Sequence, residues 1–193
     1  MPSTNPSDYT YAQTPLDDLL VVTRGVFRDH RGVFEKPHIS NEYETSKIFL
    51  NLQEVNLSLT NEVGTIRGFH QQIEPNAETK IVTCVSGSVF DCVIDMRRHS
   101  KTFGGIFSIT LSANSGVSLM IPKGFAHGFQ SLEAASTLLY CVDSRYSPKS
   151  QTGINPLSPE LIDLWPLKAA DISEQDQGQP LWANRVNRNP WRP

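Results

Sequence analysis

The sequence predicts an all-β fold, a sandwich or barrel of the jelly-roll type. Short runs rich in Val, Ile, Phe, Tyr and Thr recur every ten to fifteen residues, and these residue types favour strands. Turn signals such as Ser86-Gly87-Ser88 and Pro122-Lys123-Gly124 separate the runs. Many short strands without long helices are typical of sandwiches and barrels, and at this size the jelly roll is the commonest of them.

Eight apolar runs are expected to form the strands. The turn residues between them include Asn114-Ser115-Gly116, which supplies the positive φ that a tight reversal needs. In chain order the expected strands are Leu19–Thr23, Ile48–Thr60, Thr65–Phe69, Thr79–Val85, Ser88–Met96, Phe103–Leu111, Gly116–Ile121 and Ser136–Asp143.

Two short helices are expected at the periphery. One covers Asn41–Lys47, and the other covers Ser158–Leu164. In the second, Ser158 is expected to cap the helix and Pro159 to occupy its first turn, where its missing N–H costs nothing.

The 193 residues fit one domain that can bury a core without disulfides or metals. Both ends are rich in Pro, Asn, Ser, Gln and Arg, a composition that buries little apolar area. We therefore expect an N-terminal arm over residues 1–17, a core domain over 18–177 and a C-terminal tail over 178–193.

The overall charge and composition limit the partners and the compartment. A net charge of −3 gives no basic field, so no nucleic-acid partner is expected. The first 15 residues lack an apolar leader, and no window resembles a membrane span. No membrane partner is expected, and the cytoplasm is the expected compartment. Cys84, Cys92 and Cys141 lie in apolar runs without CxxC spacing and are expected to be buried thiols.

Polar groups at strand ends mark a candidate site, because the mouth of a jelly roll is concave and strands project side chains into it. His70 and Lys80 flank a polar stretch that contains Pro75 and reads as a loop, so both can face one cavity. Lys80 opens an apolar strand, where a charge is costly unless it is paired or lies at a wet pocket. A strand-end lysine that reaches water is the alternative.

Two further residues allow two interpretations each. His127 lies among Phe125, Gly128 and Phe129, a setting that suits a hydrogen-bonded core histidine as well as a ligand-binding one. Tyr140 ends an apolar run and, taken alone, fits a core tyrosine. A metal site is not expected, because no two of the histidines share one short segment; they are His30, His38, His70, His99 and His127.

A set of segments in a fixed order carries a family resemblance. They are Asp29-His30-Arg31-Gly32-Val33-Phe34, Asn56-Leu57-Ser58, Gly64-Thr65-Ile66-Arg67-Gly68-Phe69-His70, Lys80-Ile81-Val82 with Gly87 and Asp91, Pro122–Gln130, Tyr140, Tyr146, Trp165-Pro166 and Ser173-Glu174-Gln175-Asp176. In order and spacing they resemble the dTDP-4-dehydrorhamnose 3,5-epimerase family, the metal-free cupins that epimerise nucleotide-linked 4-keto-6-deoxy sugars. The resemblance runs from about Leu19 to Leu181.

The resemblance implies an isomerase with a cupin jelly-roll fold and no cofactor. It implies that His70 is the base that removes the proton next to the C4 ketone, with Asp176 as its orienting carboxylate. Asp91 competes for that place, since the sequence does not tell which lies nearer His70. Tyr140 would return a proton from the other face, and Lys80 would stabilise the enolate oxygen.

The same resemblance assigns substrate-binding residues. Arg67, Arg31 and His127 would hold the diphosphate or nucleotide, because the arginine fork binds phosphate oxygens in pairs. The sugar and base sites would be lined by Gln53, Asn56, Gln72, Phe34 and Tyr146.

One geometric difficulty concerns the strand that carries the base. In an ideal strand Arg67 and His70 would point to opposite sides, so a bulge at Gly68 is expected to bring both to the mouth.

Departures from the family pattern lie where the nucleotide and the sugar rim are expected. They are Lys36, Gln71, Gln151 and Gln175, and the stretch from Gln151 to Pro156 looks shorter than its family counterpart. The nucleotide base, the sugar, and the choice between C3 and C5 therefore stay open.

Two other functions stay open as well: a metal-dependent cupin oxygenase or isomerase that uses His70 and His127 as ligands, and an inactive sugar-binding cupin. The resemblance further implies a homodimer that exchanges N-terminal strands and completes each pocket.

Overall fold

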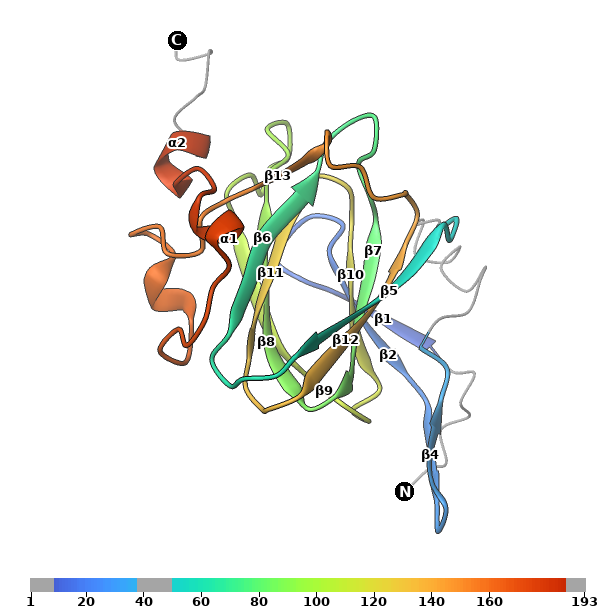
Figure 1. Cartoon of the computed structure of the whole chain (residues 1–193). Coiled ribbons are helices and arrows are strands. Elements are labelled where there is room, and N and C mark those ends of the chain that lie inside the picture. Colours follow the sequence, from blue (N-terminus) through green and yellow to red (C-terminus); the bar gives the residue numbers. More distant parts are fainter. Residues whose placement is uncertain (1–8, 38–49, 187–193) are drawn as a thin grey trace.

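The computed structural model describes residues 9–37 and 50–186, and they form a two-layer β-sandwich (Figure 1). The six-stranded sheet has the order β1 (Tyr9–Gln13), β2 (Leu20–Arg24), β10 (Val117–Ile121), β7 (Lys80–Ser86), β12 (Ser136–Val142) and β5 (Glu54–Thr60). The five-stranded sheet has the order β13 (Gln151–Gly153), β6 (Ile66–Gln72), β11 (Phe125–Ser131), β8 (Ser88–Asp95) and β9 (Ile106–Ser112). The expected all-β fold is confirmed.

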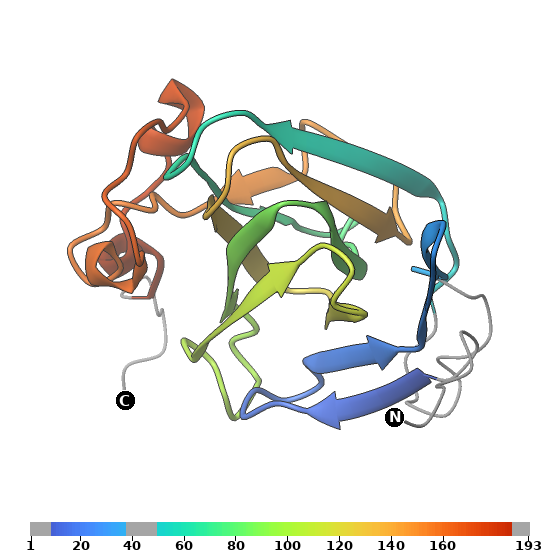
Figure 2. The ribbon, with the colours of Figure 1, turned by 90° about the horizontal axis from the view of Figure 1, so that it is seen from below.

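The remaining elements lie outside the sandwich. A hairpin of β3 (Val26–Asp29) and β4 (Gly32–Glu35) projects away from it, at the lower right of Figure 1. The 3-10 helix η2 (Ile162–Leu164) and the short helices α1 (Glu174–Gln177) and α2 (Trp182–Val186) lie together on one flank (Figure 2).

The main core fills the space between the sheets. Its members come from alternate positions of facing strands, because side chains of a strand point to opposite faces with a period of two. Val82, Val93, Leu119 and Leu138 are fully buried there. Burying each such side chain contributes about 1.5–3 kcal/mol.

A second core lies on the outer face of the five-stranded sheet, beneath the segment that carries the short helices. Phe69 packs on Trp165 with ring centroids 5.3 Å apart, and the indole N–H donates to Pro156 O at 3.0 Å. Ile66 and Ile172 belong to the same cluster. The outer face of strand β6 is therefore covered by this second core, which makes the strand a firm support for the side chains on its other face.

All eight expected strands exist, with shifted ends. The Ile48–Thr60 run contains β5 from Glu54 onwards; its first two residues lie outside the described part, as does the expected helix Asn41–Lys47. Strand β11 was not expected, because Gly124, His127 and Gly128 interrupt its apolar pattern. Its two neighbours in the sheet nevertheless bury all seven of its residues.

The expected helix at Ser158–Leu164 was wrong in detail. Only Ile162–Leu164 is helical, as one 3-10 turn, and Leu161 precedes it without a side-chain cap. The Ser158 hydroxyl donates instead to Asn155 O at 2.6 Å and accepts from Trp182 N at 2.9 Å. Ser158 thus joins two segments of the flank.

The N-terminal segment contributes to the fold more than its composition indicates. Tyr9–Gln13 pairs with β2 as an edge strand, and Leu16 is buried in the main core. At the other end, Trp182 of α2 packs on the second core. In the described residues no helix is long and apolar enough to cross a membrane. The three cysteines are buried free thiols, as expected.

Candidate active site

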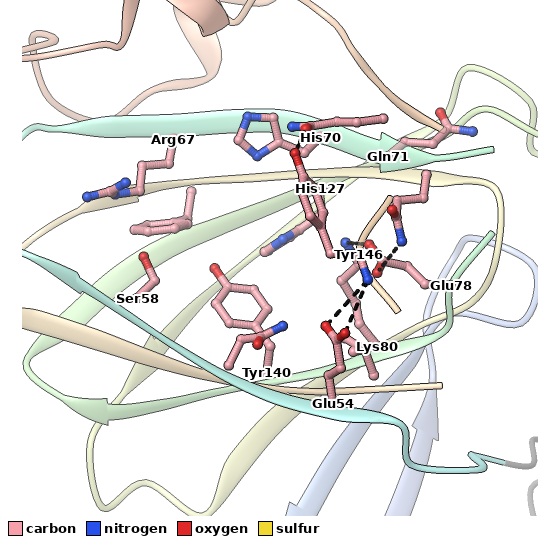
Figure 3. Close-up of a pocket in the computed structure, with 15 residues that line it drawn as sticks. Glu54, Ser58, Arg67, His70, Gln71, Glu78, Lys80, His127, Tyr140 and Tyr146 are labelled. Carbon is pink, nitrogen blue, oxygen red and sulfur yellow. Dashed lines mark hydrogen bonds and ion pairs between the residues drawn. The ribbon is translucent and has the colours of Figure 1, made fainter. Parts of the chain in front are cut away.

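A cavity of about 310 Å³ opens between the two sheets at one end of the sandwich. Figure 3 shows side chains from both sheets entering it. Three of the four expected catalytic residues, His70, Lys80 and Tyr140, line it together. The expected binding residues that line it are Asn56, Arg67, Gln72, His127 and Tyr146.

His70 lies on β6, and its ring is held from behind by a buried carboxylate. Its Nε2 lies 2.6 Å from Asp176 Oδ1, and Gly68 N donates to Asp176 Oδ2 at 3.1 Å. Burial alone would raise the pKa of Asp176, but the hydrogen bonds from His70 and Gly68 outweigh it and lower that pKa. The ionised carboxylate accepts the Nε2 proton, so Nδ1 keeps the lone pair that a base needs.

Asp176 reaches His70 from a separate element. It lies on α1, where its backbone N–H donates to the hydroxyl of Ser173 at 3.1 Å, and its residue is 3% exposed. Of the two carboxylates that the sequence left open, Asp176 is the one that contacts His70.

A bulge next to His70 sets the direction of its side chain, as expected. The register of β6 against β11 shifts between His127 and Phe129, and Gly68 has a φ of +113°. A Cβ on Gly68 would lie 2.6 Å from the Cα of Gly128. Two glycines are therefore needed where the strands approach, and Arg67 and His70 both line the cavity.

Tyr140 faces His70 from the opposite sheet. It lies on β12 and is directly paired with Asn56 of β5, and Figure 3 shows its hydroxyl in the space between the sheets. Burial raises the pKa of the Tyr140 phenol far above its ordinary value, and the charge of Asp91 adds to the effect. The phenol is thus held in its protonated form, which is the form that donates a proton.

Lys80 lies on β7, next to Tyr140 in the six-stranded sheet. Val82 of β7 pairs with Tyr140, two residues beyond Lys80, so the two side chains share the inner face. The side chain of Lys80 is only 9% exposed, and its Nζ lies 2.6 Å from Glu78 Oε1. The alternative of a lysine that reaches bulk water is therefore wrong.

The second histidine of the cavity has its own carboxylate. His127 pairs directly with His70 across the strands, and its Nε2 lies 2.8 Å from Asp91 Oδ2. Its ring meets Tyr140 edge-on at 5.9 Å between centroids. Both members of this pair are buried, so His127 resembles a support beneath Tyr140 more than an exposed phosphate ligand.

Three expected binding residues do not line the cavity. Arg31 and Phe34 lie on the projecting β3–β4 hairpin, where Arg31 binds Asp29 at 2.6 Å and its side chain is 76% exposed. Phe34 is 55% exposed. Gln53 precedes β5 and contributes a backbone hydrogen bond to Val142 O. None of the three lines the cavity of its own chain; Gln53 directly precedes Glu54, which does.

Some polar cavity residues were not predicted, among them Glu54, Ser58 and Glu78. Glu78 stands two positions before Lys80 in the sequence, but it lies in a polar loop, where a carboxylate is ordinary. Glu54 is the first residue of β5 and Glu78 lies just before β7, and the sequence pattern does not reveal that these two strand starts meet at one cavity.

Gln72 lines the cavity, as expected, and its amide also binds other parts of the protein. Its Nε2 donates to Glu78 Oε2 at 3.2 Å, and its Oε1 accepts from Ser147 N at 2.6 Å. Its amide is occupied by the protein, so it fixes the segment that carries Tyr146. No group of three or more metal-ligating side chains gathers anywhere in residues 9–37 and 50–186.

The chain is similar to one protein family over most of its length. Residues 13–184 match the family described as dTDP-4-dehydrorhamnose 3,5-epimerase. The enzyme of that name from Sinorhizobium fredii is 36% identical over 155 residues, which is 80% of each chain. A dTDP-4-dehydrorhamnose 3-epimerase from Streptomyces niveus is 36% identical over 156 residues, 80% of this chain and 75% of that one.

The fold is also similar to that of solved structures of such epimerases. A crystal structure of the 3,5-epimerase from Legionella pneumophila in complex with dTDP-4-keto-L-rhamnose superposes with a TM-score of 0.84. It is 32% identical and covers 90% of this chain and 93% of its own.

Proposed function

The chain belongs to the dTDP-4-dehydrorhamnose 3,5-epimerase family and is an isomerase of nucleotide-linked deoxysugars, and we propose that His70, Tyr140 and Lys80 carry its chemistry. The substrate that we propose is a dTDP-linked 4-keto-6-deoxyhexose. The observation that carries the proposal is the placement of a carboxylate-backed imidazole and a protonated phenol on opposite sheets across one cavity.

Proton abstraction is the task that we assign to His70. Nδ1 takes the proton from the carbon next to the C4 ketone, and the C–H electron pair moves into the carbonyl to give an enolate. The imidazole becomes an imidazolium, whose charge Asp176 stabilises at 2.6 Å. A general base of this kind contributes about 10²–10⁴-fold to the rate.

Tyr140 is the proposed acid. Its O–H gives a proton to the opposite face of the same carbon, and the enolate electrons return to form the C–H bond and the ketone. The carbon is thereby inverted. Because burial strongly disfavours the phenolate, the proton is regained from solvent or from the imidazolium before the next cycle.

Lys80 is the proposed donor to the C4 oxygen. The enolate charge develops there, and a donor already fixed in a dry cavity costs no reorganisation when the charge forms. The ammonium has three N–H groups, of which one faces Glu78.

Binding of the diphosphate is assigned to Arg67, together with Arg31 of the partner subunit in a homodimer. The β3–β4 hairpin projects from its own sandwich, and Arg31 and Phe34 at its tip are exposed. A hairpin of this length inserted beside a neighbour's cavity would add a second arginine and a further aromatic ring to those that already line it.

The outer face of β5 supports the homodimer. Val55, Leu57 and Leu59 alternate on it and are 55%, 68% and 55% exposed. Three aligned apolar side chains on an edge strand are a liability that pairing with a second copy removes.

The cytoplasm is the compartment that we propose, since three free thiols suit a reducing environment.

Isotope exchange tests the function. The purified protein is incubated in heavy water with dTDP-4-keto-6-deoxyglucose, without added cofactor, and the sugar protons are followed by NMR. We expect deuterium at C3, C5 or both, and none above buffer with His70→Asn. Absence of exchange with dTDP-, CDP- and GDP-linked 4-keto sugars alike would overturn the proposal.

A further inference from the structure

An acidic residue next to the proposed enolate donor has no part in the proton transfers described above. Glu78 Oε1 lies 2.6 Å from Lys80 Nζ, and the two side chains are 15% and 9% exposed. We propose that Glu78 is a positioning residue that holds the Lys80 ammonium toward the C4 oxygen. The inference rests on the proposed function and deepens it.

A lysine needs such a partner more than an arginine does. Its ammonium sits on a flexible four-carbon stem and is strongly hydrated in water, so an unpartnered Lys80 would spread over several rotamers at the cavity edge. One fixed N–H···O contact leaves two N–H groups of this cavity-lining ammonium free to donate to a ligand. Placement within a fraction of an ångström matters, because a 1 Å error costs on the order of 10²-fold in rate.

Glu78 is itself held in place by the protein. Its second oxygen accepts from Gln72 Nε2 at 3.2 Å, and Gln72 Oε1 accepts from the backbone N–H of Ser147 at 2.6 Å. The contacts therefore run from Lys80 on β7 through Glu78, both labelled in Figure 3, and through Gln72 to the segment that carries Tyr146. Lys80 is thereby tied to that segment.

A purely electrostatic effect of Glu78 would have the opposite sign. A carboxylate near the C4 oxygen opposes the growing negative charge of the enolate, so removing it would speed the reaction if position were irrelevant. The positioning account expects the reaction to slow. The two accounts are therefore separated by the sign of one rate change.

A double-mutant cycle tests the inference in the full-length protein. Glu78→Gln keeps an acceptor oxygen and the side-chain shape, and Lys80→Met removes the ammonium with little change in volume. We expect Glu78→Gln to lower kcat for epimerisation about 10-fold or more with KM within about 3-fold. In the Lys80→Met background the same change should have no further effect on kcat, because Glu78 acts only through Lys80.

Glu54→Gln is the matched control. It removes the same charge from the same cavity, where Glu54 accepts from Tyr146 N and not from Lys80. We expect its kcat to exceed that of Glu78→Gln by on the order of 10-fold. Thermal unfolding of each variant checks the fold, and Lys80→Met should be stabilised by adding Glu78→Gln, since an unpaired buried carboxylate is lost.

Two results would overturn the inference while leaving the proposed function intact. One is a wild-type kcat in Glu78→Gln, and the other is an equal loss of kcat in the wild-type and Lys80→Met backgrounds. Failure of the wild-type protein to exchange any sugar proton would instead overturn the proposed function itself.

Discussion

At the scale of single residues, burial by itself raises the pKa of both Tyr140 and Asp176, but the two pKa values end up shifted in opposite directions. It raises the pKa of Tyr140, where no strong donor offsets it. At Asp176 it is outweighed by hydrogen bonds from His70 and Gly68, and the pKa falls. Tyr140 is thereby kept protonated, as the proposed acid requires, and Asp176 is kept ionised, as a partner of the proposed base His70 requires. The sequence contains both residues, but only the fold determines their protonation.

The lowered pKa of Asp176 predicts a pH-dependent contribution to stability. The unfolded carboxyl has a pKa of about 3.9, and the folded one lies below its ordinary value. The stabilisation is therefore complete above the unfolded pKa and is lost as the pH falls through the folded pKa. We expect Asp176→Asn to unfold at lower urea concentration than the wild type at pH 6, and the gap to shrink below about pH 4. An unchanged gap down to pH 2 would contradict this.

At the scale of elements, periodicity predicted the strands that alternate cleanly and missed those with mixed patterns. Strand β11 escaped prediction because His127 and Gly128 stand in its middle. Position 128 requires a glycine because a Cβ there would lie 3.0 Å from Arg67 O on the neighbouring strand. A single sequence does not reveal that the two strands lie so close together. The hairpin β3–β4 and strand β13 are too short to give a periodic signal.

The sequence predicted those parts of the site that depend on short stretches of chain, and it did not predict those that depend on contacts between distant residues. His70, Lys80 and Tyr140 lie on neighbouring or facing strands and line one cavity. The choice between Asp91 and Asp176 depended on contacts between residues 106 positions apart, which pattern reading does not reach. The place of Arg31 and Phe34 was predicted by resemblance alone, and one chain does not bring them to the cavity.

The bulge at Gly68 gives an element-scale prediction. Gly68→Ala places a Cβ against the Gly128 backbone at a φ of +113°, so strand β6 must shift. Gly104→Ala is the control, because Gly104 also has a positive φ but its Cβ would make only ordinary contact with Trp182. We expect both to destabilise the protein, Gly68→Ala by about 1–3 kcal/mol more.

Denaturant unfolding measures this difference, and kcat reports the direction of His70. Gly104→Ala should keep wild-type kcat, whereas Gly68→Ala should lose most of it. Equal unfolding midpoints for the two variants would show that the β6–β11 approach is less tight than the distances indicate.

At the scale of the whole molecule, the outer face of β5 is an exposed apolar stripe, and Arg31 and Phe34 do not line the cavity of their own chain. The proposed homodimer would explain both features, because the β3–β4 hairpin of each chain would lie beside the cavity of the other chain. In that homodimer the exposed stripe of Val55, Leu57 and Leu59 would form part of the interface. The exposed Arg31 would bind the diphosphate in the partner's cavity. In the proposed function the sandwich supplies proton transfer, and the proposed homodimer completes nucleotide binding.

The dimer predicts the effect of one charge on the β5 face. Leu57→Glu places a carboxylate in the middle of the stripe, and burying it unpaired is costly, so we expect a monomer by light scattering. Its KM for the nucleotide sugar should rise about 10-fold or more, because Arg31 of the partner subunit is lost. Ile162→Glu is the control, since Ile162 is comparably exposed but lies on η2. A monomeric wild type would contradict the prediction.

The most direct test of the central claim is the fate of deuterium in Tyr140→Phe. This variant keeps His70, Asp176 and Lys80 but lacks the acid on the opposite sheet. Incubated in heavy water with dTDP-4-keto-6-deoxyglucose, it should still exchange a sugar proton, because the imidazolium can exchange the abstracted proton for deuterium from the solvent and return that deuterium to the same face. The account predicts exchange with retained configuration at that carbon, whereas the wild type gives exchange with inversion. Inversion by Tyr140→Phe at a wild-type rate would contradict the account.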